Sequence, residues 1–447
     1  GKWYLDGLSG VFVASLGYGN ERIVEATVRQ LRELHFAPPL HGTNAPSLAL
    51  AERLRLIAPV GMRGPQGEGG VGVKLLSGGS EATEAAMKLA RQYWKQAGHP
   101  RKYKIISRYG AYHGATMGAL SAGGGWERKS VFEPLVAGFL HHHPPFCFHC
   151  PFDQNYGSCG ITCAKLVRRT IEAEDPETVA AVIVEPISIS SAGFVVPPVE
   201  YLQILRQACS DHHVLLIFDE IITGFGRLGQ WFGADYYGVT PDLIACGKGM
   251  SGGYAPLAAV LIANHVWDAF LTDEPDARRE FHHGHTFGGN PVAAAAGVAA
   301  IDEIHARDLV ANAHIQGAYV RAALDRLAAD FPALIADVRG AGLLQGFEFA
   351  AGLQNNDHLG NGVDLHANGA SDSAKLSSLP ESLPVSIAQK PKPGKRFEAL
   401  ARDRGLIARC GNDYVAFAPP LIITRDELDE ILTITRACLT DMSNMSE

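Results

Sequence analysis

A lysine that stands between two glycines is the first candidate for chemistry in this sequence. The apolar run 243–246 has the character of a buried strand, and Gly247, Lys248 and Gly249 follow it directly. Lysine is rarely buried without a partner or a function. Desolvation lowers its pKa, so that the neutral amine can form a Schiff base. A structural lysine that extends its ammonium to solvent is the alternative interpretation.

Two other apolar runs end on carboxylates. The run 179–184 is followed by Glu185, and the run 214–218 is followed by Asp219. A buried acid needs a partner. Either acid alone could cap a neighbouring turn or pair with Arg227, whereas the two together point to a cationic ligand or a metal ion.

A glycine-rich turn and an aromatic residue complete the set. Ser77, Gly79 and Ser80 follow the apolar run 71–76 and open a predicted helix, where unpaired N–H groups favour a phosphate. Ser80 could instead be an ordinary helix N-cap. Tyr112 and His113 follow the run 103–107, where an aromatic ring could stack on a flat ligand or simply cover the sheet.

These groups need a parallel sheet to bring them together. Short apolar runs alternate with periodic segments such as 81–95 and 199–212, a pattern typical of an α/β fold whose strands are buried on both faces. In such sheets ligands bind beyond the carboxyl ends of the strands. We therefore expect strands at 71–76, 103–107, 179–184, 214–218 and 243–246, with the candidate residues gathered at one edge.

The assembled groups match pyridoxal phosphate, which presents a phosphate, a flat ring, a pyridine nitrogen and an aldehyde. An aspartate at the pyridine nitrogen keeps it protonated, so the ring can accept the electrons left by a departing α-proton. We assign this role to Asp219. Lys248, as a free amine, would take that proton as general base.

At this point the sequence resembles the class III (ω-)aminotransferases of the fold-type I pyridoxal-phosphate enzymes, over nearly its whole length. The matching motifs, in chain order, are Ser77-Gly78-Gly79-Ser80-Glu81-Ala82, Tyr112-His113-Gly114, Glu185-Pro186, the segment from Asp219 to Arg227, Gly247-Lys248-Gly249 and the segment from Thr286 to Pro291. The resemblance implies a large domain with a mostly parallel seven-stranded sheet between helices, and a smaller α+β domain.

The resemblance also implies roles for single residues. Lys248 would be the Schiff-base lysine, and Tyr112 and Ile221 would lie on opposite faces of the ring. Glu185 is similar to a family acid near the ring. Thr286 resembles the residue that reaches the phosphate of the neighbouring subunit. This predicts a homodimer, or a tetramer built from such dimers.

Substrate residues follow from the branch of the family that the sequence resembles most. Ile222 stands where ornithine-type members usually carry Gln, which disfavours that branch. The run 9–13 is similar to the ω-amino acid or amine:pyruvate branch, in which an aromatic residue at the Phe12 position lines the substrate pocket. Arg409 aligns with the mobile arginine of that branch, which binds a substrate carboxylate. The expected partners are an amine donor and a small 2-oxo acid acceptor such as pyruvate.

The chain is long enough for two domains, with 447 residues. We expect a large cofactor-binding domain at 45–290 and a small domain formed by 1–44 and 291–447, joined by an Ala-rich helix from 291 to about 329. Residues 342–349 and 425–438 are a predicted strand and helix of the small domain. Residues 355–395, rich in Ser, Asn, Gly, Pro and Lys, are expected to form a surface insertion.

Composition disfavours several other functions. The net charge is −8, without a basic block for nucleic acid, and no apolar run approaches the roughly 20 residues of a membrane span. Eight scattered cysteines do not make a secreted disulfide framework, so we expect a cytoplasmic, reducing compartment. Because Trp3 to Gly7 already have the character of ordered structure, we expect that a segment precedes Gly1, and a mitochondrial signal there stays open.

Three alternatives remain. The first is a class III enzyme with decarboxylase or aminomutase chemistry, because Lys248 and Asp219 do not distinguish these reactions from amino transfer. A metal-binding or redox protein is the second, because four thiolates can hold zinc, and the candidates are Cys147, Cys150, Cys159 and Cys163, with His149 and 141–143 nearby. Buried free thiols are the simpler interpretation of that cluster. A pseudoenzyme without cofactor is the third.

Overall fold

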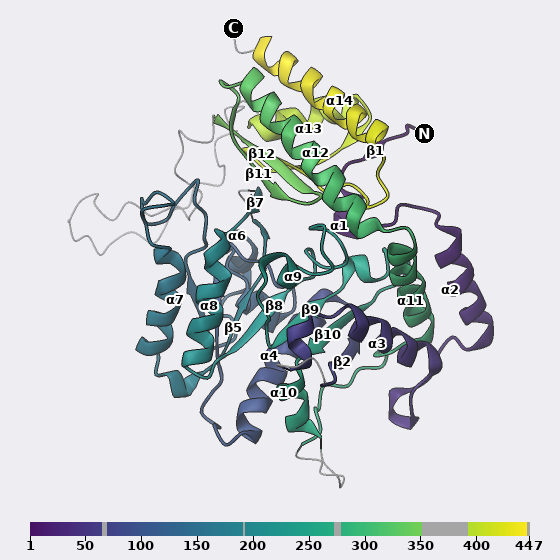
Figure 1. Ribbon diagram of the computed structural model, residues 1–447, viewed down its shortest axis with the longest axis vertical. Helices are drawn as coiled ribbons and strands as arrows, with labels where there is room; N and C mark the ends of the chain where they lie inside the picture. Colours follow the sequence, from purple (N-terminus) through teal and green to yellow (C-terminus); the bar gives the residue numbers. More distant parts are fainter. Residues whose placement is uncertain (65–68, 191–192, 272–278, 351–391, 445–447) are drawn as a thin grey trace, which may run out of the picture.

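The computed structural model describes residues 1–64, 69–190, 193–271, 279–350 and 392–444. Figure 1 shows two lobes, a large one around a central sheet and a smaller one above it that contains α12, α13 and α14. Both chain ends lie on the smaller lobe. No helix of the described ranges is long and apolar enough to cross a membrane.

The sheet of the large lobe has seven strands in the order β2-β10-β9-β8-β5-β3-β4. Only β10 runs antiparallel to its neighbours; the pairs from β9 to β4 are parallel. The predicted α/β architecture is therefore confirmed. The bounds are β2 Gly72–Leu76, β3 Lys104–Arg108, β4 Phe139–His142, β5 Val179–Val184, β8 Leu215–Asp219, β9 Leu243–Cys246 and β10 Ala258–Ile262.

The five strands predicted from apolar runs are all present, each with its ends within one residue of the prediction. The strands β5, β8, β9 and β10 are buried along their whole length. This burial explains why they appear in the sequence as continuous apolar runs rather than as alternating patterns.

Helices cover both faces of this sheet. The long helix α4 (Gly79–Gln96) packs against β10, β9, β5 and β8, mainly through small Ala side chains. On the other side α8 (Val199–Asp211) packs against β8 and against α7 (Thr162–Ala173), which lies beside it in Figure 1. The helices α2 (Glu21–Glu33) and α3 (Ala45–Ile57) both contact α11 (Pro291–Ala306).

The predicted single helix from 291 to about 329 is wrong in one respect. The chain forms two helices, α11 and α12 (Leu309–Asp330), which are separated at Arg307 and Asp308. Asp308 has a left-handed backbone, with φ 49°, and ends the continuity of the helix. The break lets α11 pack on α2 and α3 while α12 packs on the sheet of the smaller lobe.

The smaller lobe is built on a four-stranded sheet in the order β11-β12-β15-β14. Its strands are β11 Ile335–Ala341, β12 Leu344–Phe349, β14 Arg409–Cys410 and β15 Tyr414–Phe417, and its other helices are α13 Pro393–Asp403 and α14 Arg425–Asn444. Strand β12 and helix α14 correspond to the predicted strand at 342–349 and helix at 425–438. Of the predicted insertion at 355–395, residues 355–391 lie outside the described residues, and 393–395 begin α13.

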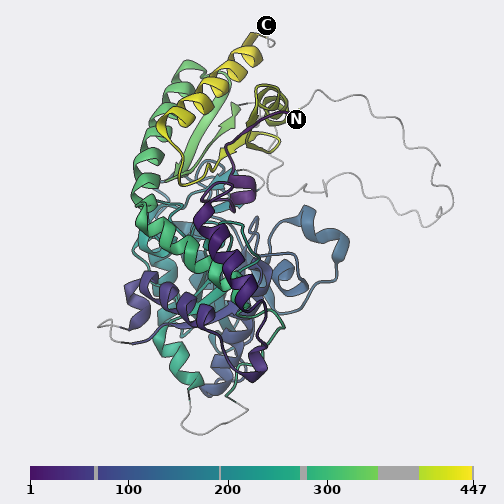
Figure 2. The ribbon, with the colours of Figure 1, turned by 90° about the vertical axis from the view of Figure 1, so that its right-hand side faces the viewer.

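The first residues of the chain join the last ones. Strand β1 (Leu5–Asp6) pairs in parallel with β13 (Leu406–Ile407), and Figure 2 shows the N-terminal segment beside the C-terminal helices. The remaining short elements are α1 Ser9–Phe12, α5 Met117–Ala122, α6 Trp126–Lys129, β6 Ser188–Ser190, β7 Gly193–Val195, α9 Gly233–Tyr237 and α10 Asn264–Trp267.

Candidate active site

Lys248 lies where β9 ends, as predicted, and its amine is uncommitted. Among the described residues its Nζ takes part in no hydrogen bond or ion pair. Burial lowers the pKa of Lys248; Asp219 and Glu185 oppose this shift, and Arg409 adds to it. A lowered pKa makes the neutral, nucleophilic amine available.

Asp219 is fixed at the end of β8 by a chain of polar contacts. It is 4% exposed, and its Oδ2 lies 2.8 Å from Nδ1 of His113. Because an ionised carboxylate only accepts hydrogen bonds, Nδ1 of the imidazole carries the proton. Nε2 of His113 then accepts from Oγ of Ser107 at 3.1 Å. His113 therefore holds Asp219 in one orientation.

Glu185, at the end of β5, has a different partner from the one considered in the sequence. Its Oε2 accepts from Nη2 of Arg108 at 3.1 Å, and its Oε1 accepts from the backbone N–H of Tyr112 at 3.2 Å. Arg227 instead donates to the carbonyl oxygens of Ala418 and Pro419, so the proposed Glu185–Arg227 pair is not formed. Glu185 thus positions the loop that carries Tyr112.

Tyr112 offers a ring that is partly open to solvent. The residue is 38% exposed, and the guanidinium of Arg128 lies 4.7 Å from the ring centroid. A cation over one face of an aromatic ring is attracted by its quadrupole. Arg128, on the short helix α6, therefore helps to hold the ring in place.

The glycine-rich turn forms the start of α4. Gly78 is the N-cap and no side chain caps the helix, so the interpretation of Ser80 as an ordinary N-cap is wrong. Oγ of Ser80 instead accepts from the N–H of Ala115 at 3.0 Å, and the N–H of Ser77 donates to Glu81 at 2.9 Å. An uncapped N-terminus of a helix is suited to an anion such as phosphate.

Ile221 lies next to two of the predicted glycines. A Cβ atom on Gly79 would approach its side chain to 3.2 Å, and so would a Cβ on Gly247. Neither position has room for a larger residue while Ile221 keeps its place. The glycines of the two motifs thus let α4 and the Lys248 turn come close to the same isoleucine.

The two predicted substrate residues come together from opposite ends of the chain. Phe12 is 2% exposed, and the guanidinium carbon of Arg409 lies 5.8 Å from the centroid of its ring. Phe194, on β7, contacts the Phe12 ring edge-on at 6.4 Å between centroids. Because Arg409 also acts on the pKa of Lys248, it lies in the vicinity of the lysine.

Thr286 follows His285, whose Nε2 lies 3.9 Å from Oε2 of Glu81 in the first turn of α4. Thr286 is exposed on the loop that precedes α11, next to Phe287, which is 60% exposed. Its predicted contact with a neighbouring subunit stays a prediction.

The cysteine cluster forms a separate feature on the loop before α7 and in the first turn of α7, which contains Cys163. Cys147, Cys150, Cys159 and Cys163 line one cavity, and all four are free thiols. Burial raises the pKa of Cys163 to about 11, so this thiol stays protonated at neutral pH. Within the described ranges, no group of three or more His, Cys, Asp or Glu side chains is placed to hold a metal ion.

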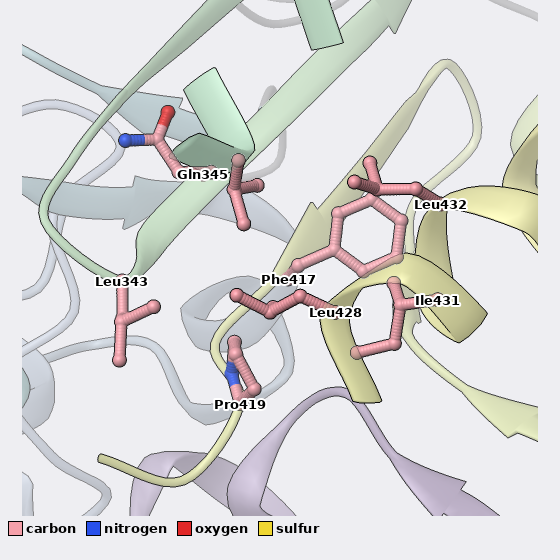
Figure 3. Close-up of a pocket in the computed structure, with 8 residues that line it drawn as sticks. Leu343, Gln345, Phe417, Pro419, Leu428, Ile431 and Leu432 are labelled. Carbon is pink, nitrogen blue, oxygen red and sulfur yellow. The ribbon is translucent and has the colours of Figure 1, made fainter. Parts of the chain in front are cut away.

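A second small cavity lies inside the smaller lobe, between its sheet and α14 (Figure 3). The side chains of Phe417, Leu428 and Ile431 point toward one another around it. Its lining is almost entirely apolar and includes none of the predicted site residues, so it belongs to the packing of this lobe.

Four residues that contact the site were missed in the sequence, namely Ser107, Arg108, Arg128 and Tyr414. The partner of Arg108, Glu185, is 77 residues away along the chain, and such a pair leaves no local pattern. One signal was present, because Ser107 and Arg108 end an apolar run in the same way as the recognised residues do. Tyr414 gave no comparable signal.

Comparison with known proteins agrees with this geometry. A family model described as Aminotransferase class-III matches residues 1–439. The chain is 35% identical over 444 residues to the probable aminotransferase Rv3329 of Mycobacterium tuberculosis, covering 99% of this chain and 86% of that protein. It is 39% identical over 312 residues to a beta-alanine–pyruvate aminotransferase of Pseudomonas aeruginosa, covering 69% and 67%.

Solved structures give the same result. An amine transaminase from an uncultivated Pseudomonas species, solved in the PLP-bound form, matches with a TM-score of 0.84 and 29% identity, covering 98% of this chain and 90% of that one.

Proposed function

The chain belongs to the class-III aminotransferases, which use pyridoxal phosphate, and on this premise we propose that it moves an amino group from an ω-amino acid or amine to a small 2-oxo acid such as pyruvate. The observation that carries the substrate class is Arg409. Among the described residues its terminal nitrogens, Nη1 and Nη2, take part in no hydrogen bond or ion pair. Two such nitrogens suit a carboxylate.

The residues of the site fit pyridoxal phosphate. The uncapped start of α4, with Gly79, Ser80 and the preceding Ser77, would hold the phosphate. Asp219, fixed by His113, would face the pyridine nitrogen, and Tyr112 and Ile221 would enclose the ring. The free amine of Lys248 would attach the aldehyde carbon.

Each protein group then has a role that follows from its surroundings. When bound, pyridoxal phosphate supplies an electron sink for the pair left at the α-carbon after loss of a proton. The buried carboxylate of Asp219 would stabilise a positive charge on the pyridine nitrogen of the bound cofactor. The Lys248 amine, whose pKa is lowered by burial, can accept and return a proton.

The amine donor and the 2-oxo acid acceptor must be bound in the same site. An ω-amino acid and a 2-oxo acid both carry a carboxylate, whereas a simple amine does not. Arg409 would bind the carboxylate, and the Phe12 ring below it would form the apolar wall. The resemblance to a beta-alanine–pyruvate aminotransferase supports this assignment.

We further propose a homodimer in which Thr286 contacts the cofactor of the partner subunit, and the domain division at 45–290 against 1–44 and 291–447. The exposure of Thr286 and Phe287 on one loop supports a covered position in a dimer. Sedimentation of the holoenzyme tests the assembly.

The first experiment follows the visible absorbance of the purified holoenzyme while ω-amino acids and simple amines are added, and then pyruvate. A donor should bleach the band of the bound cofactor and pyruvate should restore it. A band that no amine bleaches would overturn the proposed transfer and favour the decarboxylase or aminomutase chemistry of other class III enzymes.

A substitution tests the substrate class itself. Arg409→Ala should weaken the affinity for β-alanine by about tenfold or more, because a hydrogen bond to a charged group contributes about 1.5–3 kcal/mol. The affinity for benzylamine, which has no carboxylate, should fall much less. Equal losses for both donors in the half-reaction would contradict the assigned role of Arg409.

A further inference from the structure

The substrate arginine has an anchor that the sequence did not indicate. Nε of Arg409 donates to the hydroxyl oxygen of Tyr414 at 3.3 Å. The two residues lie on adjacent antiparallel strands, β14 and β15, joined by a tight turn. The strand pairing therefore fixes the distance between their backbones.

The ring of Tyr414 has little freedom. It is 4% exposed and is enclosed by two glycines. A Cβ on Gly411 would approach the ring to 2.1 Å, and a Cβ on Gly193 would approach it to 3.2 Å. Because the ring is confined in this way, its hydroxyl is presented at a fixed point.

The hydrogen bond to Tyr414 involves one nitrogen of the guanidinium only. Nε donates to Tyr414, while the guanidinium carbon lies 5.8 Å from the centroid of the Phe12 ring. The two terminal nitrogens, which form the fork that matches a carboxylate, stay free to bind among the described residues. The arginine is thus held in the pocket and remains open toward a ligand.

We propose that Tyr414 is a positioning residue that holds Arg409 in its carboxylate-binding orientation and so biases the enzyme toward donors that carry a carboxylate. This proposal rests on the proposed role of Arg409. A long arginine side chain loses considerable rotamer freedom when it binds. The hydrogen bond to the Tyr414 hydroxyl restricts the arginine side chain before the ligand binds. Less conformational entropy is then lost on binding, which strengthens carboxylate binding. It also opposes the outward movement that an uncharged donor would require.

The test is the substitution Tyr414→Phe, which removes the hydroxyl and keeps the confined ring. Tyr319→Phe is the matched control, because its hydroxyl also bonds to a side chain, Asp429, but on the outer surface of the smaller lobe. Arg409→Ala serves as the reference for loss of the whole group. Thermal unfolding of each holoenzyme verifies that the fold is kept.

The first readout is calorimetric binding of propionate, a carboxylate without an amino group, to each holoenzyme. Tyr414→Phe should weaken it by about tenfold, the effect of one charge-assisted hydrogen bond. Tyr319→Phe should match the wild type. The second readout is the donor half-reaction, in which the ratio of β-alanine affinity to benzylamine affinity should fall by about tenfold in Tyr414→Phe.

The outcomes separate the two levels of inference. If Arg409→Ala binds propionate as well as the wild type does, the carboxylate site itself is wrong. If Arg409→Ala loses binding while Tyr414→Phe keeps it, the anchoring role of Tyr414 is overturned and the site stands. An equal loss of affinity for β-alanine and benzylamine in Tyr414→Phe would also overturn it, because a general structural defect does not discriminate between donors.

Discussion

At the level of single residues, the site places two cationic side chains near each other and gives them different surroundings. Lys248 is mostly buried and its pKa is lowered, whereas Arg409 keeps a guanidinium that is always charged. Arg409 adds to the lowering of the Lys248 pKa, and its guanidinium would bind the carboxylate of a substrate in the proposed function.

Replacement of Lys248 by alanine should remove both activity and the attachment of the cofactor. We expect no turnover above background and loss of the visible absorbance band of the bound cofactor, because Lys248 is the lysine proposed to attach the cofactor. Lys104→Ala is the control, since that lysine pairs with Glu174 at the opposite end of its strand. A Lys248→Ala protein that kept both signals would show that another lysine carries the reaction.

His113 offers a test of the support behind Asp219. His113→Ala removes a charge-assisted hydrogen bond of 2.8 Å, and kcat should fall by about ten- to a hundredfold while the cofactor stays bound. His113→Gln, which can still donate to the carboxylate, should recover part of the loss. Unchanged kcat in His113→Ala would mean that Asp219 needs no such support.

The positions of the candidate residues at strand ends could be predicted from the sequence because each one follows an apolar run. Lys248, Asp219 and Glu185 belong to this class. Their supporting residues could not, because Arg108 finds Glu185 and Tyr414 finds Arg409 only through the strand pairing of the folded chain. A side chain that acts by positioning another one is recognised from its contacts in the folded structure and not from a local sequence pattern.

At the level of elements, one buried acid serves the architecture rather than the chemistry. Glu220 follows the catalytic strand β8, but its carboxylate accepts from the backbone N–H groups of Gly233 and Ala234 at 2.6 and 2.7 Å. It therefore caps the start of α9. Burial raises its pKa to about 7.

This shift predicts a dependence of stability on pH. An acid with a raised pKa binds its proton more tightly in the folded state than in the unfolded state, so its contribution falls as pH rises. Between pH 5 and 7 the unfolding free energy of the wild type, minus that of Glu220→Gln, should decrease by at most about 1.4 kcal/mol per pH unit. Urea unfolding of the holoenzymes measures it, and a difference that is constant with pH would refute the assignment.

The elements show where sequence patterns suffice and where they fail. Strands buried on both faces were placed within one residue of their ends, because a short continuous apolar run bounded by turn residues is typical of a buried strand. The break between α11 and α12 could not be predicted, because the two residues at the break, Arg307 and Asp308, are neither glycine nor proline, the usual helix breakers. Asp308 instead adopts a left-handed backbone, which aspartate reaches more readily than most residues other than glycine but which its presence in a sequence does not by itself predict.

At the level of the whole molecule, Arg227 connects segments from both ends of the chain. It is 2% exposed and donates to the carbonyls of Ala418 and Pro419 and to Oγ of Ser9. Burial lowers the pKa of Arg227 to about 10, so it is still charged at neutral pH.

Arg227→Met should destabilise the protein by about 2–4 kcal/mol, because buried acceptors would lose their donor. Arg321→Met is the control; that arginine forms an exposed pair with Asp325 within one helix, which contributes at most about 0.5 kcal/mol. Chemical unfolding of both variants measures the effect. A loss for Arg227→Met no larger than that of the control would show that the segments are held by other contacts.

The pairing of β1 with β13 has a consequence for biosynthesis. Leu5 leaves the ribosome long before its strand partner, Leu406, which follows only near the end of this sequence. At about 5–20 residues per second, the nascent N-terminal segment must wait for tens of seconds with its edge unpaired. Phe12 and Arg409 meet only after the same interval, so a truncated product could complete the large sheet and still lack the proposed substrate pocket. On the proposed role of Arg409, selectivity is among the last properties that the growing chain acquires.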